Sequence, residues 1–431
     1  MRAVAGNRVS FRELALVATL NLSASAHAGL TLDEAFRIAE SANPALQSAR
    51  STRVAAEGVV SEASGLLFNN PVVAGDFVRR QVSGSAPIVD QAILGQTWGE
   101  WGAGLSQTFE VAGQHGYRRD AAKAGFDAAL RNIDAVLRAL RADVERAFVV
   151  VLALQARIDI EREALRVAED TAEAVRKRVR AGEDSKLEGN LASIEAERAH
   201  NQLRLLGEQL TSARTVLASL LQLPPSDLPE AIGELAPGPA PYTFETLLEA
   251  AATRPQLRTL ESRERAARSQ LALEQAAVYP DVTLGVGMGR EGFNDARERL
   301  TLFSVSVPLP LFRRNQAGIG RASTELAQTQ IERQAALRDA RAQVVALWRN
   351  LKSLRARVER LIEAVQPKLE ENLRLSSTAF RAGELGLVEL LLVNRQVLDG
   401  RRDLLDATTE LRLTRVAIEE AAGWTDPRGQ P

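Results

Sequence analysis

Cysteine is absent from the 431 residues of this chain. Its absence excludes disulfide bonds, thiol catalysis, cysteine-ligated metals and a lipid-modified N-terminal cysteine. Histidine is nearly absent too, since His27, His115 and His200 are the only three, which is too few for a histidine metal cluster. We therefore expect no metal site and no cofactor, and we expect His115 and His200 to lie at the surface.

Long apolar runs and nucleotide motifs are also missing. No run beyond the N-terminus approaches the roughly 18 apolar residues of a membrane-spanning helix, so a membrane crossing would need strands. There is no P-loop, and the glycines of residues 285–289 lie inside a strand-like alternation, which argues against a dinucleotide loop. The net charge of −1 suggests no nucleic-acid partner. No nucleophile–base pairing points to an enzyme.

The N-terminus has the pattern of a secretory signal over residues 1–28. Arg2, Arg8 and Arg12 are basic, residues 14–22 form a short apolar run, and Ala26-His27-Ala28 fits a cleavage site. A poorly formed helix is the alternative. The remaining chain divides into a first repeat (29–222), a Pro- and Gly-rich linker (223–242), a second repeat (243–424) and a tail (425–431).

The repeats are most visible at two short turns. Arg180-Ala181-Gly182-Glu183 recurs 201 positions later as Arg381-Ala382-Gly383-Glu384. Each glycine stands where a helix C-cap requires positive φ. A proline-free segment of about 64 residues, some 96 Å of helix, precedes the first turn, and residues 185–221 and 386–422 return along the long segments. Two apolar stripes at spacings of three and four predict coiled-coil-like packing: Leu140, Val144, Phe148, Val151, Leu154 and Ile158, and Leu347, Leu351, Leu354, Val358, Leu361 and Val365.

Strand-like alternation marks residues 71–109 and 280–311. We expect two hairpins there, with loops near Ser83–Gln96 and Arg290–Arg299, although residues 72–80 alternate poorly. Val307 and Leu309 continue the last strand pattern. The strands are long enough to cross a tilted bilayer, but four cannot close a barrel. The sequence predicts an oligomeric barrel, or alternatively a soluble sheet. Short helices open each repeat, at Thr31 with a break at Asn43-Pro44, and again at Thr243 and Arg254-Pro255.

The order of elements resembles that of the outer membrane efflux proteins of the TolC family. It consists of a helix, a hairpin, a long helix, an Arg-Ala-Gly turn and a helix, and it occurs twice. Asn70-Pro71 and residues 105–118 resemble the CzcC-like, heavy-metal branch, whose segment reads Q-x-x-E-x-G-G-K-R. Here Ala112 replaces the first glycine and Gln114 the lysine. The resemblance implies a mainly α fold with a small β part. It implies a homotrimer with a 12-stranded barrel and a periplasmic α-barrel.

The resemblance also implies partners and a function. It implies outer membrane lipid around the strands, a periplasmic adaptor on the turns and an inner-membrane pump of the RND type. The exported substrate would be a heavy-metal cation of the cobalt, zinc and cadmium or copper and silver kind. A multidrug or other small-molecule duct, or a secreted structural coiled coil, is the alternative.

Two groups of site residues follow from the resemblance. The turns that would dock the adaptor comprise Arg180, Ala181, Gly182, Glu183, Asp184, Arg381, Ala382, Gly383, Glu384, Leu385 and Gly386. Glu188 and Glu389 align with carboxylates that narrow the periplasmic aperture in TolC-like channels. Leu385 replaces an arginine that holds the family's closed state, and we expect Arg381 or Lys186 to substitute. The alternative for both glutamates is a solvated helix face near a positive helix end.

Overall fold

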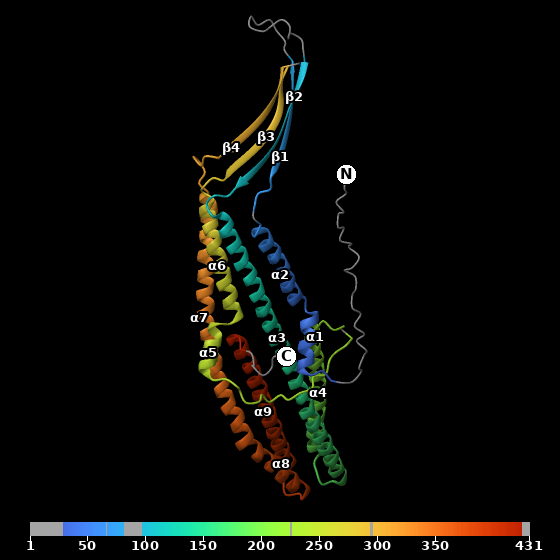
Figure 1. Ribbon diagram of the computed structural model, residues 1–431. Coiled ribbons are helices and arrows are strands. Elements are labelled where there is room, and N and C mark those ends of the chain that lie inside the picture. The colour runs from blue at the N-terminus through green and yellow to red at the C-terminus, as the bar shows by residue number, and fades with distance from the viewer. Residues whose placement is uncertain (1–28, 66, 82–96, 225, 294–295, 425–431) are drawn as a thin grey trace.

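A computed structural model describes residues 29–65, 67–81, 97–224, 226–293 and 296–424. The molecule is elongated, with a sheet at one end and two helical hairpins reaching the other (Figure 1). The predicted signal, the whole of the predicted loop Ser83–Gln96 and the C-terminal tail lie outside the described residues.

Each repeat supplies the same series of elements. The first contains α1 (Leu32–Ala42), α2 (Pro44–Ala63), β1 (Val72–Gln81), β2 (Thr97–Phe109), α3 (Gln114–Ala181) and α4 (Lys186–Leu221). The second contains α5 (Phe244–Ala252), α6 (Pro255–Ala276), β3 (Val282–Phe293), β4 (Ala296–Ser306), α7 (Gln316–Arg360), the π-helical turn η2 (Leu361–Val365), α8 (Gln366–Arg381) and α9 (Leu387–Ala422). The mainly α fold with a small β part is thus confirmed.

Side-chain caps fix where the opening helices begin. Thr31 and Glu34 form a reciprocal capping box at α1, which satisfies two backbone N–H groups that the helix cannot. The Asn43 side chain accepts from the N–H of Ala45, and Pro44 occupies the first position of α2, where a missing N–H costs nothing. Thr243 and Thr246 form a capping box at α5, as Thr31 and Glu34 do at α1.

The four strands form one antiparallel sheet in the order β1-β2-β3-β4. Residues 72–80 do form a strand. The predicted loop Arg290–Arg299 was wrong, because Arg290 pairs with Arg299 and the ladder continues to Phe293 and Ala296. Val307 and Leu309 were wrongly included in the last strand. It ends at Ser306, since Pro308 and Pro310 have no N–H to donate to a ladder.

The α3 helix is the longest element, with 68 residues, or about 102 Å at 1.5 Å per residue. Its predicted stripe is inside the first repeat, where Val144, Phe148 and Val151 pack with Leu46 and Leu217. The second repeat has a separate core, in which Val344 packs with Leu247 and Ile418. Each repeat therefore buries its own apolar face.

The corresponding helix of the second repeat is not continuous. The π-helical turn η2 separates α7 from α8, which the sequence analysis did not foresee. Pro367 explains the interruption, since it lacks an N–H and its ring would clash with the carbonyl of Glu363, four residues earlier. The chain bends where α7 gives way to α8 (Figure 1).

Ion pairs join the two repeats where α3 runs beside α9. Glu161, whose side chain is 2% exposed, accepts from both Nε and Nη2 of Arg402 at 2.7 Å. Closer to the N-terminus of α3, Arg157 pairs with Asp406 at 3.1 Å and Glu145 pairs with Arg412 at 2.6 Å. The series ends with Arg146 and Glu420 at 2.5 Å. We call this set the α3–α9 ladder.

The turn that ends α3 recurs at the end of α8. Gly182 has φ +80° and Gly383 has φ +76°. The N–H of Gly182 donates to Val179 and that of Glu183 to Arg178; Gly383 and Glu384 repeat both bonds with Phe380 and Ala379. The glycine C-caps predicted from sequence are confirmed.

Alanine at either glycine should destabilise the protein by about 1–2 kcal/mol. Nothing lies within 4 Å of a Cβ built on Gly182 or Gly383, so only the left-handed backbone opposes the substitution. Gly207→Ala, in the interior of α4 and equally unobstructed, is the control and should stabilise by roughly 0.5–1 kcal/mol. Melting temperatures of the three variants test this. A Gly383→Ala variant as stable as Gly207→Ala would contradict it.

Glu161→Ala should cost about 3–5 kcal/mol, because it leaves Arg402 and Arg157 without their buried partner. Glu163→Ala removes a neighbouring carboxylate whose pair with Arg166 is exposed, and should cost under about 1 kcal/mol. Thermal unfolding compares the two. Equal losses would show that the ladder does not hold the repeats together.

Candidate functional site

An ion pair spans the turn between α3 and α4. Arg178 Nη2 lies 2.9 Å from Asp184 Oδ1, and the Asp184 side chain is nearly buried. Directly after it, Ser185 and Glu188 form a capping box, in which Glu188 accepts from the Ser185 N–H at 2.8 Å. That backbone hydrogen bond, with a second from the Ser185 hydroxyl, lowers the pKa of Glu188. Glu188 thus points back at the turn that precedes it.

The second turn has the same backbone but a different set of side chains. Leu385 stands where the first turn has Asp184, and Gly386 where it has Ser185. Glu389 still accepts from the N–H of Gly386, at 3.2 Å. The second turn therefore keeps the glutamate and loses both the ion pair and the hydroxyl cap.

The two hairpins touch each other beside these turns. Leu387, at the start of α9, is 3% exposed and packs against Ala172 and Val175 of α3 and Ala192 of α4. Its counterpart at the start of α4, Lys186, is exposed. One hairpin thus inserts an apolar side chain into the other, with no reciprocal insertion.

A cation contributes to the same contact. The Arg178 guanidinium lies 5.5 Å from the centre of the Phe380 ring on α8, within the range of a cation–π interaction. Arg381, which with Lys186 was one of the two residues expected to substitute for the missing arginine, donates to the Ser377 carbonyl of its own helix. Beside the turns, Arg178 thus supplies a cationic contact between the hairpins.

The structure brings the predicted turn residues together in two groups, one on each hairpin. Nine of the eleven are exposed, and Asp184 and Leu385 are half-buried. Sequence reasoning missed Arg178, Phe380 and Leu387. The available signal was a departure from the repeat, since Ala379 takes the place of Arg178 and Leu387 that of Lys186.

A second polar site lies where β2 meets α3. Arg118 pairs with Glu110 and lies over the Phe68 ring, 3.5 Å from its centre. Gln114 is buried, accepts from the Ala112 N–H and donates to Asp281 at 3.2 Å. Burial, and then Glu110, raise the pKa of Asp281. Residues of the 105–118 motif thus fasten the sheet to the helices and the first repeat to the second.

His115 departs from its prediction. It lies in the same junction and is half-buried, and its Nε2 is buried without a hydrogen-bond partner among the described residues. His200 is at the surface as expected, 2.9 Å from Glu169.

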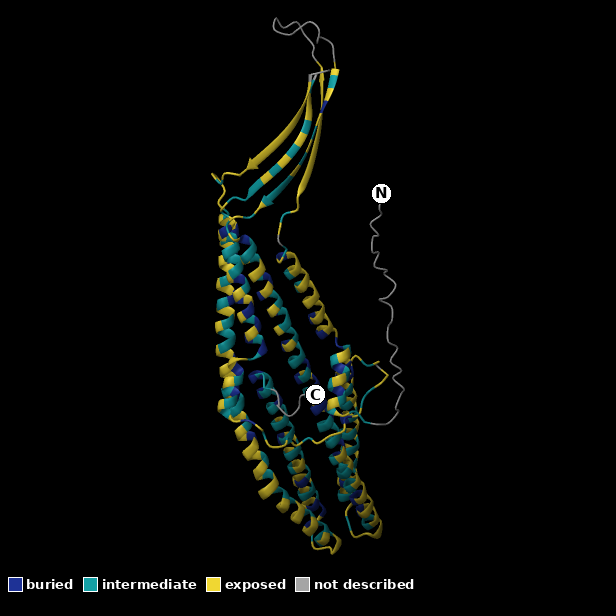
Figure 2. Ribbon diagram, in the orientation of Figure 1, coloured by how far each residue is buried: buried dark blue, intermediate teal, exposed yellow. Residues whose placement is uncertain are grey.

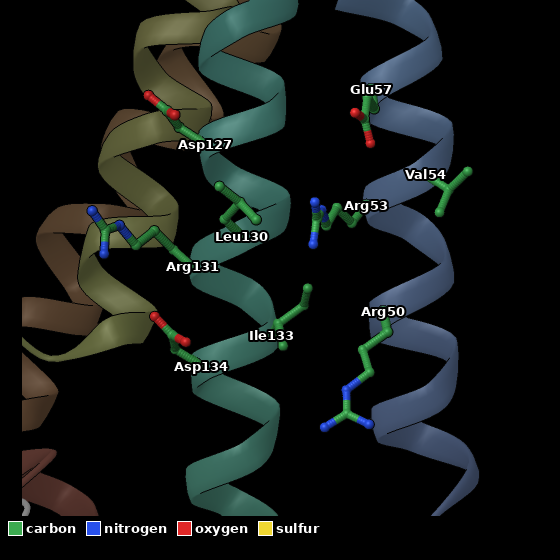
Figure 3. Close-up of a pocket in the computed structure, with 9 residues that line it drawn as sticks. All are labelled: Arg50, Arg53, Val54, Glu57, Asp127, Leu130, Arg131, Ile133 and Asp134. Carbon is green, nitrogen blue, oxygen red and sulfur yellow. The ribbon is translucent and has the colours of Figure 1, made fainter.

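A groove of about 760 Å³ separates α2 from α3. Arg50 and Arg53 extend from α2 into it, and Ile133 projects from α3 (Figure 3). A second groove, of about 610 Å³, lies between the two hairpins close to the turns, with Val388, Leu391 and Leu392 in its wall. Both grooves lie along helices rather than enclosing a reaction centre.

Groups of three or more metal-binding side chains do not occur in the part of the chain that the structure describes. Across the same residues, no helix combines the length and apolar character needed to cross a membrane.

Comparison with known proteins identifies the family. Residues 35–222 and 246–424 match the model of the outer membrane efflux protein family. The cobalt-zinc-cadmium resistance protein CzcC of Cupriavidus metallidurans is 24% identical over 321 residues, covering 74% of this chain and 76% of CzcC. The pyoverdine export outer membrane protein OpmQ of Pseudomonas putida is 29% identical over 341 residues, covering 74% and 70%.

Solved structures share the fold. The outer membrane protein VceC of Vibrio cholerae has a TM-score of 0.75 at 20% identity, over 91% of this chain and 96% of VceC. CusC has a TM-score of 0.73 at 19% identity, over 91% and 92%. With a family match across most of its length and a fold shared with these proteins, the chain belongs to the outer membrane efflux protein family.

Proposed function

We propose that three copies of this chain form the exit duct of a tripartite efflux system that exports heavy-metal cations. The duct would join a periplasmic adaptor and an inner-membrane pump of the RND type, and it would transport rather than catalyse. The observation that carries the proposal is the repeated pair of hairpins on a sheet that cannot close by itself.

The open edges of the chain support assembly. At the sheet the edges are β1 and β4, and along the helices they are α2 and α4 on one side and α7 and α8 on the other. Large apolar side chains are exposed on both sides, among them Val54 and Leu187 on the first and Ile331 and Leu375 on the second. Edges of different composition favour a head-to-tail ring, and three copies would supply twelve strands. The α2–α3 groove lies at one such edge (Figure 3).

The substrate class rests on the likeness to CzcC and on the 105–118 motif. OpmQ is named for pyoverdine export and supports a small organic substrate as the second candidate. Deleting the gene in its own host separates the two. Sensitivity to cobalt, zinc or cadmium is the expected result, whereas unchanged metal resistance with retained siderophore would favour the second.

The exposed turns are proposed as the adaptor contact. Gly383→Trp should abolish metal resistance by blocking docking, because the indole would project into open space on the turn. Gly383→Ala, which bears the same backbone strain without the bulk, is the matched control and should retain resistance. Oligomer mass and adaptor crosslinking are measured on both. Crosslinking that survives Gly383→Trp and Gly182→Trp together would rule out the turns.

Glu188 and Glu389 are proposed as rings of carboxylates at the periplasmic aperture. Both lie in the first turn of a returning helix, at the same level as the exposed turns. Three carboxylates in one constriction attract cations. The capping bonds to Ser185 and Gly386 support the alternative, in which the glutamates only stabilise the helix ends.

Single-channel conductance decides between these roles. Glu188→Ala with Glu389→Ala should weaken cation selectivity and remove block by multivalent cations added from the periplasmic side. Glu384→Ala, which removes an exposed turn carboxylate outside the returning helix, is the control and should leave block intact. Unchanged selectivity and block in the double variant would leave only the capping role.

A further inference from the structure

The charged residues of the sheet are sorted by face. Residues directly opposite in a ladder share a face, and successive residues alternate. The registers place all four strand carboxylates on one face: Asp76, Glu100, Glu291 and Glu298. Four of the five strand arginines lie on the other face: Arg79, Arg290, Arg297 and Arg299. The fifth, Arg80, shares the carboxylate face and pairs with Glu100 at 2.7 Å.

The arginine face is also the apolar face. It carries most of the large hydrophobic side chains, which are exposed in the single chain: Val73, Phe77, Trp101, Leu105, Leu284, Val286, Met288, Phe303 and Val305. The opposite face is rich in glycine, serine and threonine. Along β3, exposed residues alternate with half-buried ones (Figure 2). In an outer-membrane barrel the apolar face meets lipid, so these arginines point outward.

The arginines are confined to one end of this apolar face. One row across the sheet reads Phe77, Trp101, Arg290 and Arg299. Arg79 and Arg297 lie in the row farther from the helices, and the apolar residues lie on the helix side. From Val282 to Arg290 the strand covers about 26 Å, which at a tilt of ~40° rises roughly 20 Å. Because the helices extend into the periplasm, the arginines reach the outer leaflet.

These arginines have no anionic partner within the described part of the chain. Arg290 and Arg299 are directly opposite each other, an arrangement that destabilises a sheet when the charges are alike. Arg80, on the other face, shows that this sheet pairs an arginine when a carboxylate is near. Among the described residues nothing neutralises this exposed like-charged pair, so an anion bound beside it would relieve the repulsion.

We propose that Arg290, Arg297 and Arg299, with Arg79, bind the phosphate groups of phosphorylated lipid headgroups in the outer leaflet. Guanidinium groups bind phosphate oxygens in pairs, and the aromatic row below would lie at the level of the headgroup boundary. Lipid phosphates then neutralise the repulsion between Arg290 and Arg299. The proposal rests on the outer-membrane placement of the sheet and is independent of the exported substrate.

Binding of diphosphoryl lipid A to the full complex in neutral detergent tests the proposal. The variant is Arg290→Gln with Arg297→Gln and Arg299→Gln. Each arginine lost near a membrane surface weakens binding about fivefold, so the triple variant should bind roughly a hundredfold more weakly. The control removes three exposed arginines from α7, Arg338→Gln, Arg349→Gln and Arg355→Gln, and should bind as the wild type does.

Two further arms identify the occupant. Lipid A stripped of both phosphates should bind the wild type as weakly as the triple variant binds the intact lipid. Inorganic phosphate at the same concentration should not compete. Wild-type affinity in the triple variant, equal binding of the stripped lipid, or full competition by inorganic phosphate would each overturn the proposal.

Stability gives a second readout. Without lipid A the triple variant should melt no lower than the wild type, since it loses a repulsive pair, and added lipid A should raise the melting temperature of the wild type alone. An equal rise in both would also overturn the proposal. If the triple variant does not assemble, Arg290→Gln and Arg299→Gln singly should each lose about fivefold in affinity. Channel conductance should be unchanged, so failure here is separable from failure of the export function.

Discussion

The α3–α9 ladder is the interaction on which the shape of the molecule depends. Each repeat buries its own apolar stripe, and α3 also packs against α6 of the second repeat. Along α9, charged side chains join the two repeats. These ion pairs are partly buried, and from Glu145 through Arg157 to Glu161 the partners on α9 run backwards, from Arg412 through Asp406 to Arg402. Such pairs lose much of their value when one partner is removed, because the other stays buried. They therefore fix the position of one helix along the other more than they add stability.

Near the turns, the contact between the two hairpins is no longer made by ion pairs. There the ladder gives way to the insertion of Leu387 between α3 and α4 and to the Arg178–Phe380 contact. Both depend on residues that differ between the repeats, while the backbone turns themselves are the same. The two repeats thus share the same backbone turns but carry different side chains there, and these differences allow one hairpin to pack against the other.

Much of this architecture was readable from the sequence. The long helices, the glycine C-caps and the strand segments follow from spacings of three and four, from positive-φ residues and from alternation, all of which are local. Which distant residue a given side chain pairs with cannot be read from such local patterns. Glu161 and Arg402 are 241 positions apart, and nothing in either neighbourhood specifies the other. The strand register that places Arg290 opposite Arg299 depends on a ladder that continues to Phe293 and Ala296, and the polar composition of residues 290–299 does not indicate a strand. The turn glutamates were identified from the resemblance to TolC-like channels, but their capping bonds follow from three-residue spacing and could have been predicted.

The π-helical turn in the second repeat has a consequence for how the two halves correspond. In the core, Val144 matches Val344 and Phe148 matches Trp348, an offset of 200 residues. At the turns Gly182 matches Gly383, an offset of 201. The second repeat thus has one more residue between its core and its turn. An extra residue in a regular helix would rotate everything beyond it by about 100°. The residue falls in the interval that contains Leu361–Val365, and a wider turn can hold it without that rotation. The difference of one residue is thereby confined to one bend, and the core and the turn on either side of it face the same way as in the first repeat.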